Sequence, residues 1–361
     1  MNMENYNSAS SQRIDYIDAL KGFLILSVVM CHVAGFCIGI QSDIPSFQHI
    51  LYEFRNPPFF FISGFFAYKT VLWNCKSLKA VLKKKFRTIA WPTILFLAAL
   101  MYIQPSHNGH VLITRDVNSL WFHWFTLSLF LFFIFYSLFA LCAHHLKNEK
   151  IKSMILLSIS ILLYLLFSIQ SIYNILPFSD FIKELFGMKY WGFFLFFSLG
   201  ILARKHYSVF LYWLNNSFFI GICIILFFTF NLFYKFLVEN HFTLFQITTY
   251  FTGIILVFGY FKTFPPKGML KTIMVFTGKK TLDIYLVHYF LLPLSLYDYT
   301  SELRDIPVPI LELIVTLSIS IIIISVSLLI SNITRLSPVT AFLIWGDNSN
   351  LQLKKNKIMK R

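Results

Sequence analysis

The sequence predicts an all-α, polytopic integral membrane helix bundle of about ten transmembrane helices. Of its 361 residues, 57% are hydrophobic and only 13% are charged, whereas soluble domains carry about 25% charged residues. The apolar residues also gather into long runs, and about 20 such residues are enough to span a bilayer as a helix. This composition excludes a soluble enzyme, a disordered chain and a secreted disulfide scaffold.

Ten apolar runs are candidates for membrane-spanning helices, and polar, turn-forming segments separate them. The third, sixth and ninth runs are short or interrupted. In order, the runs are Ile17–Gly39, Ile50–Tyr68, Thr88–Gln104, Leu120–Ala143, Ser153–Ile172, Tyr190–Ala203, Ser217–Val238, Thr243–Phe261, Thr281–Leu296 and Val308–Ile330.

Lysine and arginine alternate between the two sides of these runs. The segments before the first run and after each even-numbered run are basic, whereas those after the odd-numbered runs hold few basic residues. The positive-inside rule then places both termini in the cytoplasm. The net charge of +15 therefore indicates membrane topology and not nucleic-acid binding. Residues 347–361 form a basic cytoplasmic tail, for which attraction to anionic lipid headgroups is the simplest role.

The first run carries a polar stripe. Lys21 and His32 are eleven residues apart, which is close to three helical turns, so both side chains project from one face. They are separated by about 16 Å along the axis, and the stripe therefore leads from the cytoplasmic surface to mid-membrane. Asp18 precedes Lys21 by three residues and can pair with it. The alternative interpretation is an ordinary ion pair and one polar residue that bridges helices.

The second run opens with the segment Arg55–Pro58, which contains two prolines. Prolines free backbone groups that the protein interior must satisfy. Arg55 at this depth requires a partner. Later in the run, Ser63 and Gly64 form a small-residue patch, which favours close helix packing over nucleophile chemistry.

A lysine-rich segment precedes the third run. Lys84 and Arg87 are three residues apart, so they can share a helix face and form an anion-binding pair at the cytoplasmic boundary. The neighbouring Lys83 and Lys85 are interpreted as charges that set topology.

Two further histidines lie in the runs. His123 follows Trp121 near the predicted outer end of the fourth run, where aromatic residues usually anchor a helix at the interface. His288 lies eight residues past Lys280, at a depth similar to that of His32, so these two histidines can line one cavity. The chain has no glycine-rich phosphate loop, H-E-x-x-H motif or acidic metal cluster near the runs, which argues against a metalloprotease or an ATPase.

These motifs together resemble the acyltransferase-3 family of integral membrane O-acyltransferases. Five segments carry the resemblance, in the family's order: Tyr16, Asp18, Lys21-Gly22 and His32; Phe59 to Gly64; Lys84, Arg87 and Pro92; Trp121-Phe122; and Gly278 to His288. The sequence departs from the family at Lys84, where arginine is common, and at Arg55-Asn56-Pro57, where H-x-P or M-P is usual.

The resemblance implies transfer of an acyl group, usually acetyl from acetyl-CoA, to a hydroxyl of a carbohydrate, a cell-surface polysaccharide or a lipid-linked glycan. Acyl-CoA is then a donor substrate, with no permanently bound cofactor and no metal. The expected location is the plasma or inner membrane, and residues 1–346 form the membrane-embedded domain. The implied roles are catalysis by His32 and His288, donor binding by Lys21, Lys84 and Arg87, and substrate binding by Asp18, Arg55, Trp121 and His123. His32 would act as the general base.

Two other classes of protein stay open at this point. A polytopic transporter or flippase for a glycan or lipid should show internal repeats and paired broken helices, and the sequence offers one proline-opened run. A non-catalytic membrane scaffold leaves His32 and His288 without a role. Movement of substrate across vesicles without an acyl donor would favour the transporter.

Overall fold

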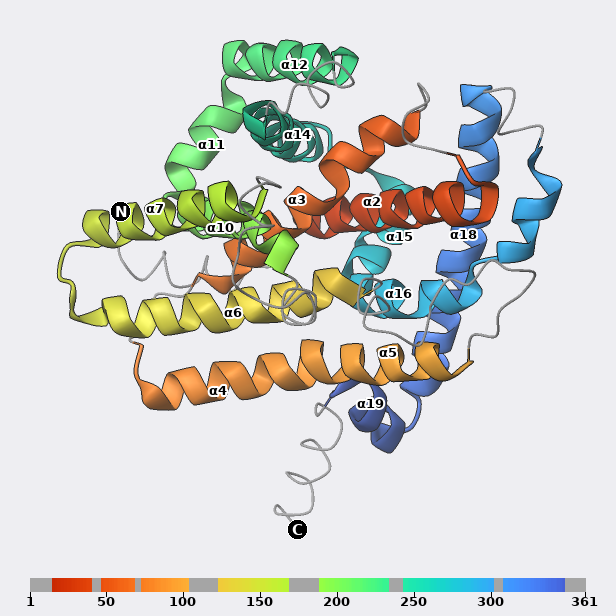
Figure 1. The fold of residues 1–361 in the computed structure, drawn as a ribbon, viewed down its shortest axis with the longest axis horizontal. Coiled ribbons are helices and arrows are strands. Elements are labelled where there is room, and N and C mark those ends of the chain that lie inside the picture. Colours follow the sequence, from red (N-terminus) through yellow and green to blue (C-terminus); the bar gives the residue numbers. More distant parts are fainter. Residues whose placement is uncertain are drawn as a thin grey trace.

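The computed structural model describes residues 15–40, 47–68, 73–103, 123–168, 188–233, 243–301 and 308–347, and every regular element within them is a helix (Figure 1). In order these are α2 (Asp15–His32), η1 (Val33–Ile38), α3 (Phe47–Ala67), α4 (Cys75–Lys85), η2 (Phe86–Ala90), α5 (Trp91–Ile103), α6 (Trp124–Cys142), η4 (Ala143–His145), α7 (Glu149–Ser168), η5 (Met188–Phe193), α10 (Phe194–Lys205), α11 (Tyr207–Asn215), α12 (Ser217–Leu232), α14 (Thr243–Thr263), α15 (Gly268–Lys279), α16 (Thr281–Val287), η6 (His288–Leu291), η7 (Leu294–Tyr299), α18 (Pro309–Thr334) and α19 (Pro338–Trp345).

Several of these helices suit a membrane. Four stretches of the described chain are long and apolar enough to cross one: Asp15–Ile38, Trp124–His145, Glu149–Phe167 and Pro309–Thr334. The count becomes five if the bent pair Tyr190–Lys205 and Tyr207–Asn215 is one span. A helical membrane protein is therefore supported. The count of ten spans and the orientation of the termini stay predictions, and the basic tail after Asp347 lies outside the described residues.

One of the predicted runs is broken in the structure. The ninth run holds α16, which has only seven residues, followed by the 3-10 turns η6 and η7. Pro293 lies within that run and cannot continue a helical hydrogen-bond ladder. The sixth run lies in η5 and α10, and the chain bends by 99° into α11 after it. Helices α4, α11, α15 and α19 lie outside the ten runs.

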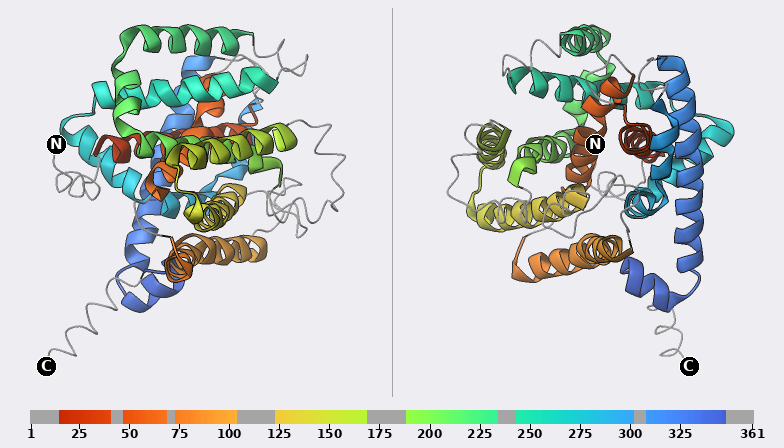
Figure 2. Two further views of the ribbon diagram at one scale, coloured as in Figure 1. Left: turned by 90° about the vertical axis from the view of Figure 1, so that its left-hand side faces the viewer. Right: turned by 45° about the vertical axis from the view of Figure 1, so that its right-hand side comes forward.

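Helix α2 occupies the centre of the molecule and contacts α3, α14, α15, α16 and α18. Figure 1 shows α12 at one edge and α4 with α5 at the opposite edge. The two views of Figure 2 show α18 running along one side of the molecule, with α19 beside α5 at its lower end. The side chains of α2 therefore lie in the middle of the helix bundle.

Glycines let two pairs of helices approach until their backbones touch. A Cβ atom on Gly64 of α3 would lie 1.8 Å from the carbonyl oxygen of Phe197, and one on Gly200 of α10 would lie 2.0 Å from that of Phe61. The predicted close packing at Gly64 is thus confirmed.

The same device joins α2 to α15. A Cβ atom on Gly22 would lie 2.2 Å from the carbonyl oxygen of Met274, and one on Gly278 would lie 1.7 Å from that of Asp18. These separations leave no room for any larger residue at either crossing.

We predict that Gly64→Ala and Gly200→Ala destabilise the fold, because the added methyl must push two backbones apart. Overpacking of this kind costs about 1–3 kcal/mol. Thermal unfolding of the purified protein in detergent measures the effect. Gly221→Ala is the matched control, since a Cβ there meets no atom within 4 Å. Equal stability of Gly64→Ala and Gly221→Ala would contradict the close packing.

Candidate active site

A pair of histidines lies at the heart of the structure. The Nδ1 atom of His32 is 2.8 Å from the Nε2 atom of His288. The two rings are stacked, with an interplanar angle of 8° and centroids 5.1 Å apart. His288 is fully buried and His32 is half-buried. The structure thus brings together the two histidines that the sequence placed at similar depth.

The contacts of His288 fix which ring atoms carry protons. Its Nδ1 atom is 3.1 Å from the carbonyl oxygen of Ile284, and because a carbonyl can only accept, Nδ1 must donate. In a neutral ring, Nε2 of His288 then accepts, so the Nδ1–H of His32 donates to it. This assignment leaves the Nε2 atom of His32 with an available lone pair, which is the requirement for a general base.

Each histidine lies where a regular helix changes form. His32 is the last residue of α2, and the chain continues as the π-helix η1. This conformation is rare in proteins overall but frequent at functional sites. The π-helix ends at Gly39, whose φ of 80° is left-handed. His288 opens the 3-10 turn η6 directly after α16. Both histidines thus lie at the junction between an α-helix and a helix of another form.

Arg55 of α3 supplies a positive charge beside the pair. It is 7% exposed and lies within electrostatic range of both histidines. It is also within electrostatic range of the buried thiol of Cys31, and so is the carboxylate of Glu312. Arg55 therefore lies in a buried polar cluster around α2, where the sequence predicted that it needs a partner.

His123 is the third histidine of the site. It precedes α6 and is fully buried, with its ring 6.1 Å from that of Tyr285 and 5.5 Å from that of Tyr289. Neither of its ring nitrogens has a hydrogen-bond partner among the described residues. A buried unsatisfied polar group is costly unless a ligand completes it, so His123 is suited to bind a hydroxyl. Trp121 lies outside the described residues.

The polar stripe of α2 lines a cavity of ≈ 250 Å³. Lys21, Ile25 and Val28 form one wall, and His32 is the next residue of that helix face by spacing. Tyr285 of α16 lines the same cavity, and its ring is 5.8 Å from that of His288. The cavity therefore extends from a lysine to a neighbour of the histidine pair, and neither histidine is among its lining residues.

Asp18 forms the predicted ion pair with Lys21, with a distance of 2.6 Å between Nζ and Oδ1. Its side chain is 6% exposed. The pair makes Asp18 a fixed partner of a lysine that lines the cavity, and its contact with a substrate stays a prediction.

Lys85, and not Lys84, points into the cavity. Lys85 lines it, with Nζ 3.5 Å from the centroid of the Phe133 ring, whereas Lys84 is exposed and Arg87 does not line it. The helix changes from α4 to the π-helix η2 at Phe86. The three-residue spacing used to pair Lys84 with Arg87 does not hold across this junction, because a π-helix has more residues per turn.

Contacts from the C-terminal segment fix the helix that leads into His288. Asp283 of α16 is 4% exposed and binds Arg335 of α18, with Nη2 to Oδ1 at 2.9 Å. Arg335 also reaches Asp347 at 3.2 Å. Next to it, the backbone of Gly346 packs on the backbone of Arg87, where a Cβ atom would lie 2.0 Å from the Arg87 carbonyl oxygen. These contacts tie the helix that leads into His288 to the chain that carries Arg87.

Asn56, Thr126 and Tyr285 also line the cavity. Asn56 and Tyr285 lie in segments that the resemblance to the family singled out, whereas nothing in the sequence separates Thr126 from an ordinary helix residue. In the described part of the chain, no group of three or more His, Cys, Asp and Glu side chains is arranged to hold a metal ion.

Comparisons with known proteins give one match. A family model described as an acyltransferase domain matches residues 14–332, nearly the whole chain. No curated protein and no solved structure matches significantly.

We predict that diethyl pyrocarbonate modifies the histidines in the order of their exposure. His144 is exposed, His32 is half-buried, and His123 and His288 are fully buried. His144 should react first, His32 more slowly, and the other two only after unfolding. Mass spectrometry of timed digests measures the order, and the denatured protein gives the reference rates. Early modification of His288 would contradict its burial.

Proposed function

The chain belongs to the acyltransferase-3 family, and on this premise we propose that it is an O-acetyltransferase of the plasma or inner membrane. Its donor is acetyl-CoA, and its acceptor is a hydroxyl of a cell-surface polysaccharide or a lipid-linked glycan. The observation that supports this most is the His32–His288 pair, with Nδ1 and Nε2 at 2.8 Å, beyond a cavity with two lysines at its mouth.

The donor is proposed to enter from the lysine side. Lys21 and Lys85 both line the cavity, and their ammonium groups suit the phosphates of CoA. The pantetheine arm then follows the apolar wall of Ile25 and Val28 and brings the thioester to His32. The arm is extended and narrow, which fits a cavity of ≈ 250 Å³.

In the chemical step, one imidazole both accepts the proton and gives it back. The Nε2 atom of His32 removes the proton of the acceptor hydroxyl as its oxygen attacks the thioester carbonyl carbon. The tetrahedral intermediate collapses, the carbon–sulfur bond breaks, and the thiolate takes the proton from His32. The products are an O-acetyl ester and free CoA. His288 holds His32 in the required tautomer, and the buried positive charge of Arg55 beside the pair would stabilise the oxygen that becomes negative.

The acceptor is proposed to bind on the side of His123. The ring nitrogens of His123 lack partners among the described residues, and they lie within electrostatic range of His288. A sugar hydroxyl can donate to one nitrogen or accept from the other, which orients the sugar for attack.

We predict that His32→Ala lowers kcat for acetyl transfer by about 10²–10⁴, the usual contribution of a general base. His288→Ala should lower kcat less and leave KM for acetyl-CoA unchanged, because His288 positions His32 and does not touch the donor. Radiolabelled acetyl transfer from acetyl-CoA to membrane glycans measures both. His145→Ala is the control at an exposed histidine that lines neither cavity. Normal activity of a well-expressed His32→Ala protein would overturn the assignment, and glycan movement across vesicles without acetyl-CoA would favour the transporter.

We also predict that Lys85→Ala raises KM for acetyl-CoA by about tenfold with little change in kcat, because it removes a contact made equally in the ground and transition states. Lys84→Ala is the matched control, since it deletes the same charge from an exposed neighbour. A larger effect of Lys84→Ala would show that the family's basic pair, and not Lys85, binds the donor.

A further inference from the structure

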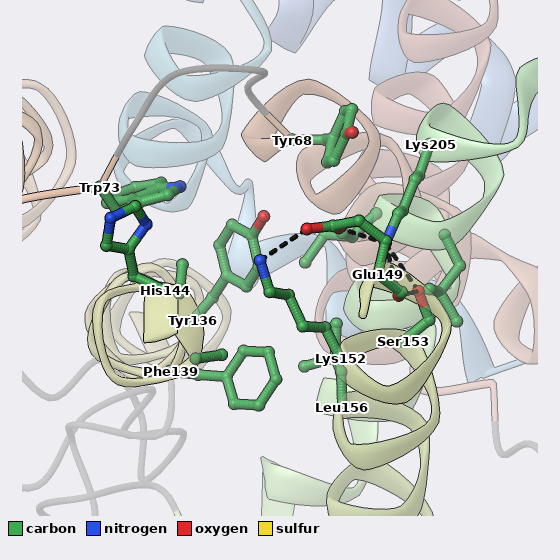
Figure 3. Close-up of a pocket in the computed structure, with 14 residues that line it drawn as sticks. Tyr68, Trp73, Tyr136, Phe139, His144, Glu149, Lys152, Ser153, Leu156 and Lys205 are labelled. Atoms are coloured by element: carbon green, nitrogen blue, oxygen red, sulfur yellow. Dashed lines mark hydrogen bonds and ion pairs between the residues drawn. The ribbon is translucent and has the colours of Figure 1, made fainter. Parts of the chain in front are cut away.

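A second cavity, of ≈ 340 Å³, lies apart from the one beneath the histidine pair. Helices α3, α6, α7 and α10 surround it at their ends, and the two cavities share none of their lining residues among those described. Figure 3 shows its two sides. Lys205, Lys152 and Glu149 lie on one side, and Trp73 with His144 lies on the other. The lysines belong to connections that the sequence assigns to the cytoplasm.

Two ammonium groups converge on a single carboxylate in this cavity. Nζ of Lys152 is 2.5 Å from Oε1 of Glu149, and Nζ of Lys205 is 2.8 Å from Oε2. Lys205 also donates to Ser153 Oγ at 2.9 Å. The two lysine side chains are 22% and 14% exposed, whereas that of Glu149 is 60% exposed. The cluster therefore has a net positive charge, and its anion is the most easily displaced member.

Helix ends strengthen the preference for an anion. Glu149 is the first residue of α7, where the helix dipole places positive potential. Asn148 accepts from the backbone N–H of Lys150 at 2.9 Å and thereby caps that helix. A ligand anion in place of the Glu149 carboxylate would meet the same dipole and the same two ammonium groups.

The opposite wall is aromatic. The rings of Trp73 and Tyr136 are packed edge to face with centroids 6.1 Å apart, and both line the cavity with Phe139. Such a wall favours the apolar or planar part of a ligand. A volume of ≈ 340 Å³ lies in the range of small-molecule pockets.

We propose that this cavity is a second binding site, for a phosphate group attached to a planar or apolar moiety. The phosphate takes the place of the Glu149 carboxylate on Lys152 and Lys205. A phosphate monoester has more acceptor oxygens and more charge than the carboxylate. A lipid phosphodiester matches its single charge, and the carboxylate, at 60% exposure, can turn into water. The organic part rests against Trp73 and Tyr136. Two sources have this chemistry: a nucleotide such as adenosine 3′,5′-bisphosphate, and an anionic phospholipid headgroup. The inference does not require acyl transfer, since binding alone defines the site.

Binding measurements on the full chain test the proposal. The nucleotide arm titrates adenosine 3′,5′-bisphosphate into detergent-solubilised protein by calorimetry. The lipid arm compares retention of phosphatidylglycerol and phosphatidylcholine by native mass spectrometry. Lys205→Met should weaken binding of the active probe by about tenfold or more. Glu149→Gln should tighten it, because the competing carboxylate is gone, whereas Lys150→Met outside the cavity should change nothing.

The results separate the sources and the sites. Nucleotide binding that depends on Lys205 identifies a nucleotide site, and preferential retention of phosphatidylglycerol that depends on Lys205 identifies a lipid site. Binding that is lost in Lys85→Ala and kept in Lys205→Met belongs to the other cavity and overturns the proposal. Absence of both kinds of binding in the wild type and in Glu149→Gln also overturns it. Lys205→Arg keeps the charge and checks that loss of binding is not loss of folding.

Discussion

The backbone contact between α2 and α15 is the constraint on which the candidate site depends. Gly22 and Gly278 allow it, because a Cβ atom at either position would overlap a carbonyl oxygen of the other helix. His32 lies ten residues after Gly22, and His288 lies ten residues after Gly278. From the crossing, α2 runs on as one helix to His32, whereas the other segment of chain breaks at Lys280 between α15 and α16 before it reaches His288. The contact of α16 with α2 then brings the second imidazole back to the first.

Charge is distributed along this axis according to what each depth can tolerate. Buried charges need partners, and Asp283 with Arg335 and Asp18 with Lys21 satisfy that requirement through short ion pairs. The imidazole pair lies deeper, beside the buried Arg55 and near the buried Glu312. The lysines that are proposed to hold the donor stay where water still reaches them. The proposed reaction thus joins two partly exposed lysines to a buried cluster of histidines and charged side chains.

The sequence predicted the parts of the site that depend on regular periodicity. The shared face of Lys21 and His32, the pairing of Asp18 with Lys21, and the close packing at Gly64 all follow from α-helical spacing or from residue size. The family was also identified from its motifs. Lys85 was missed because the π-helix after it shifts the register of the face, and no residue pattern marks that shift.

Other parts depend on tertiary contacts that a linear pattern does not contain. The sequence predicted that His123 lies near the membrane interface among aromatic anchors, yet it is fully buried against Tyr285 and Tyr289. A segment rich in aromatic residues has the same pattern whether it faces lipid or protein, so the sequence does not distinguish the two environments. The chain bends at His206, between α10 and α11, and no proline or glycine at that position predicts the bend. Trp121, the basic tail and the number of spans stay as predictions.

The hydrogen bond from His288 to the Ile284 carbonyl has a consequence for the fate of the donor. Because this bond pins one proton to the backbone, the pair can neither release a proton inward nor receive one from that side. In the proposed reaction, the proton taken from the acceptor therefore leaves through the same nitrogen that accepted it, toward the departing sulfur. One imidazole would then serve in turn as the base for the acceptor and as the acid for the leaving group, and the proposed turnover would require no second proton-transfer residue.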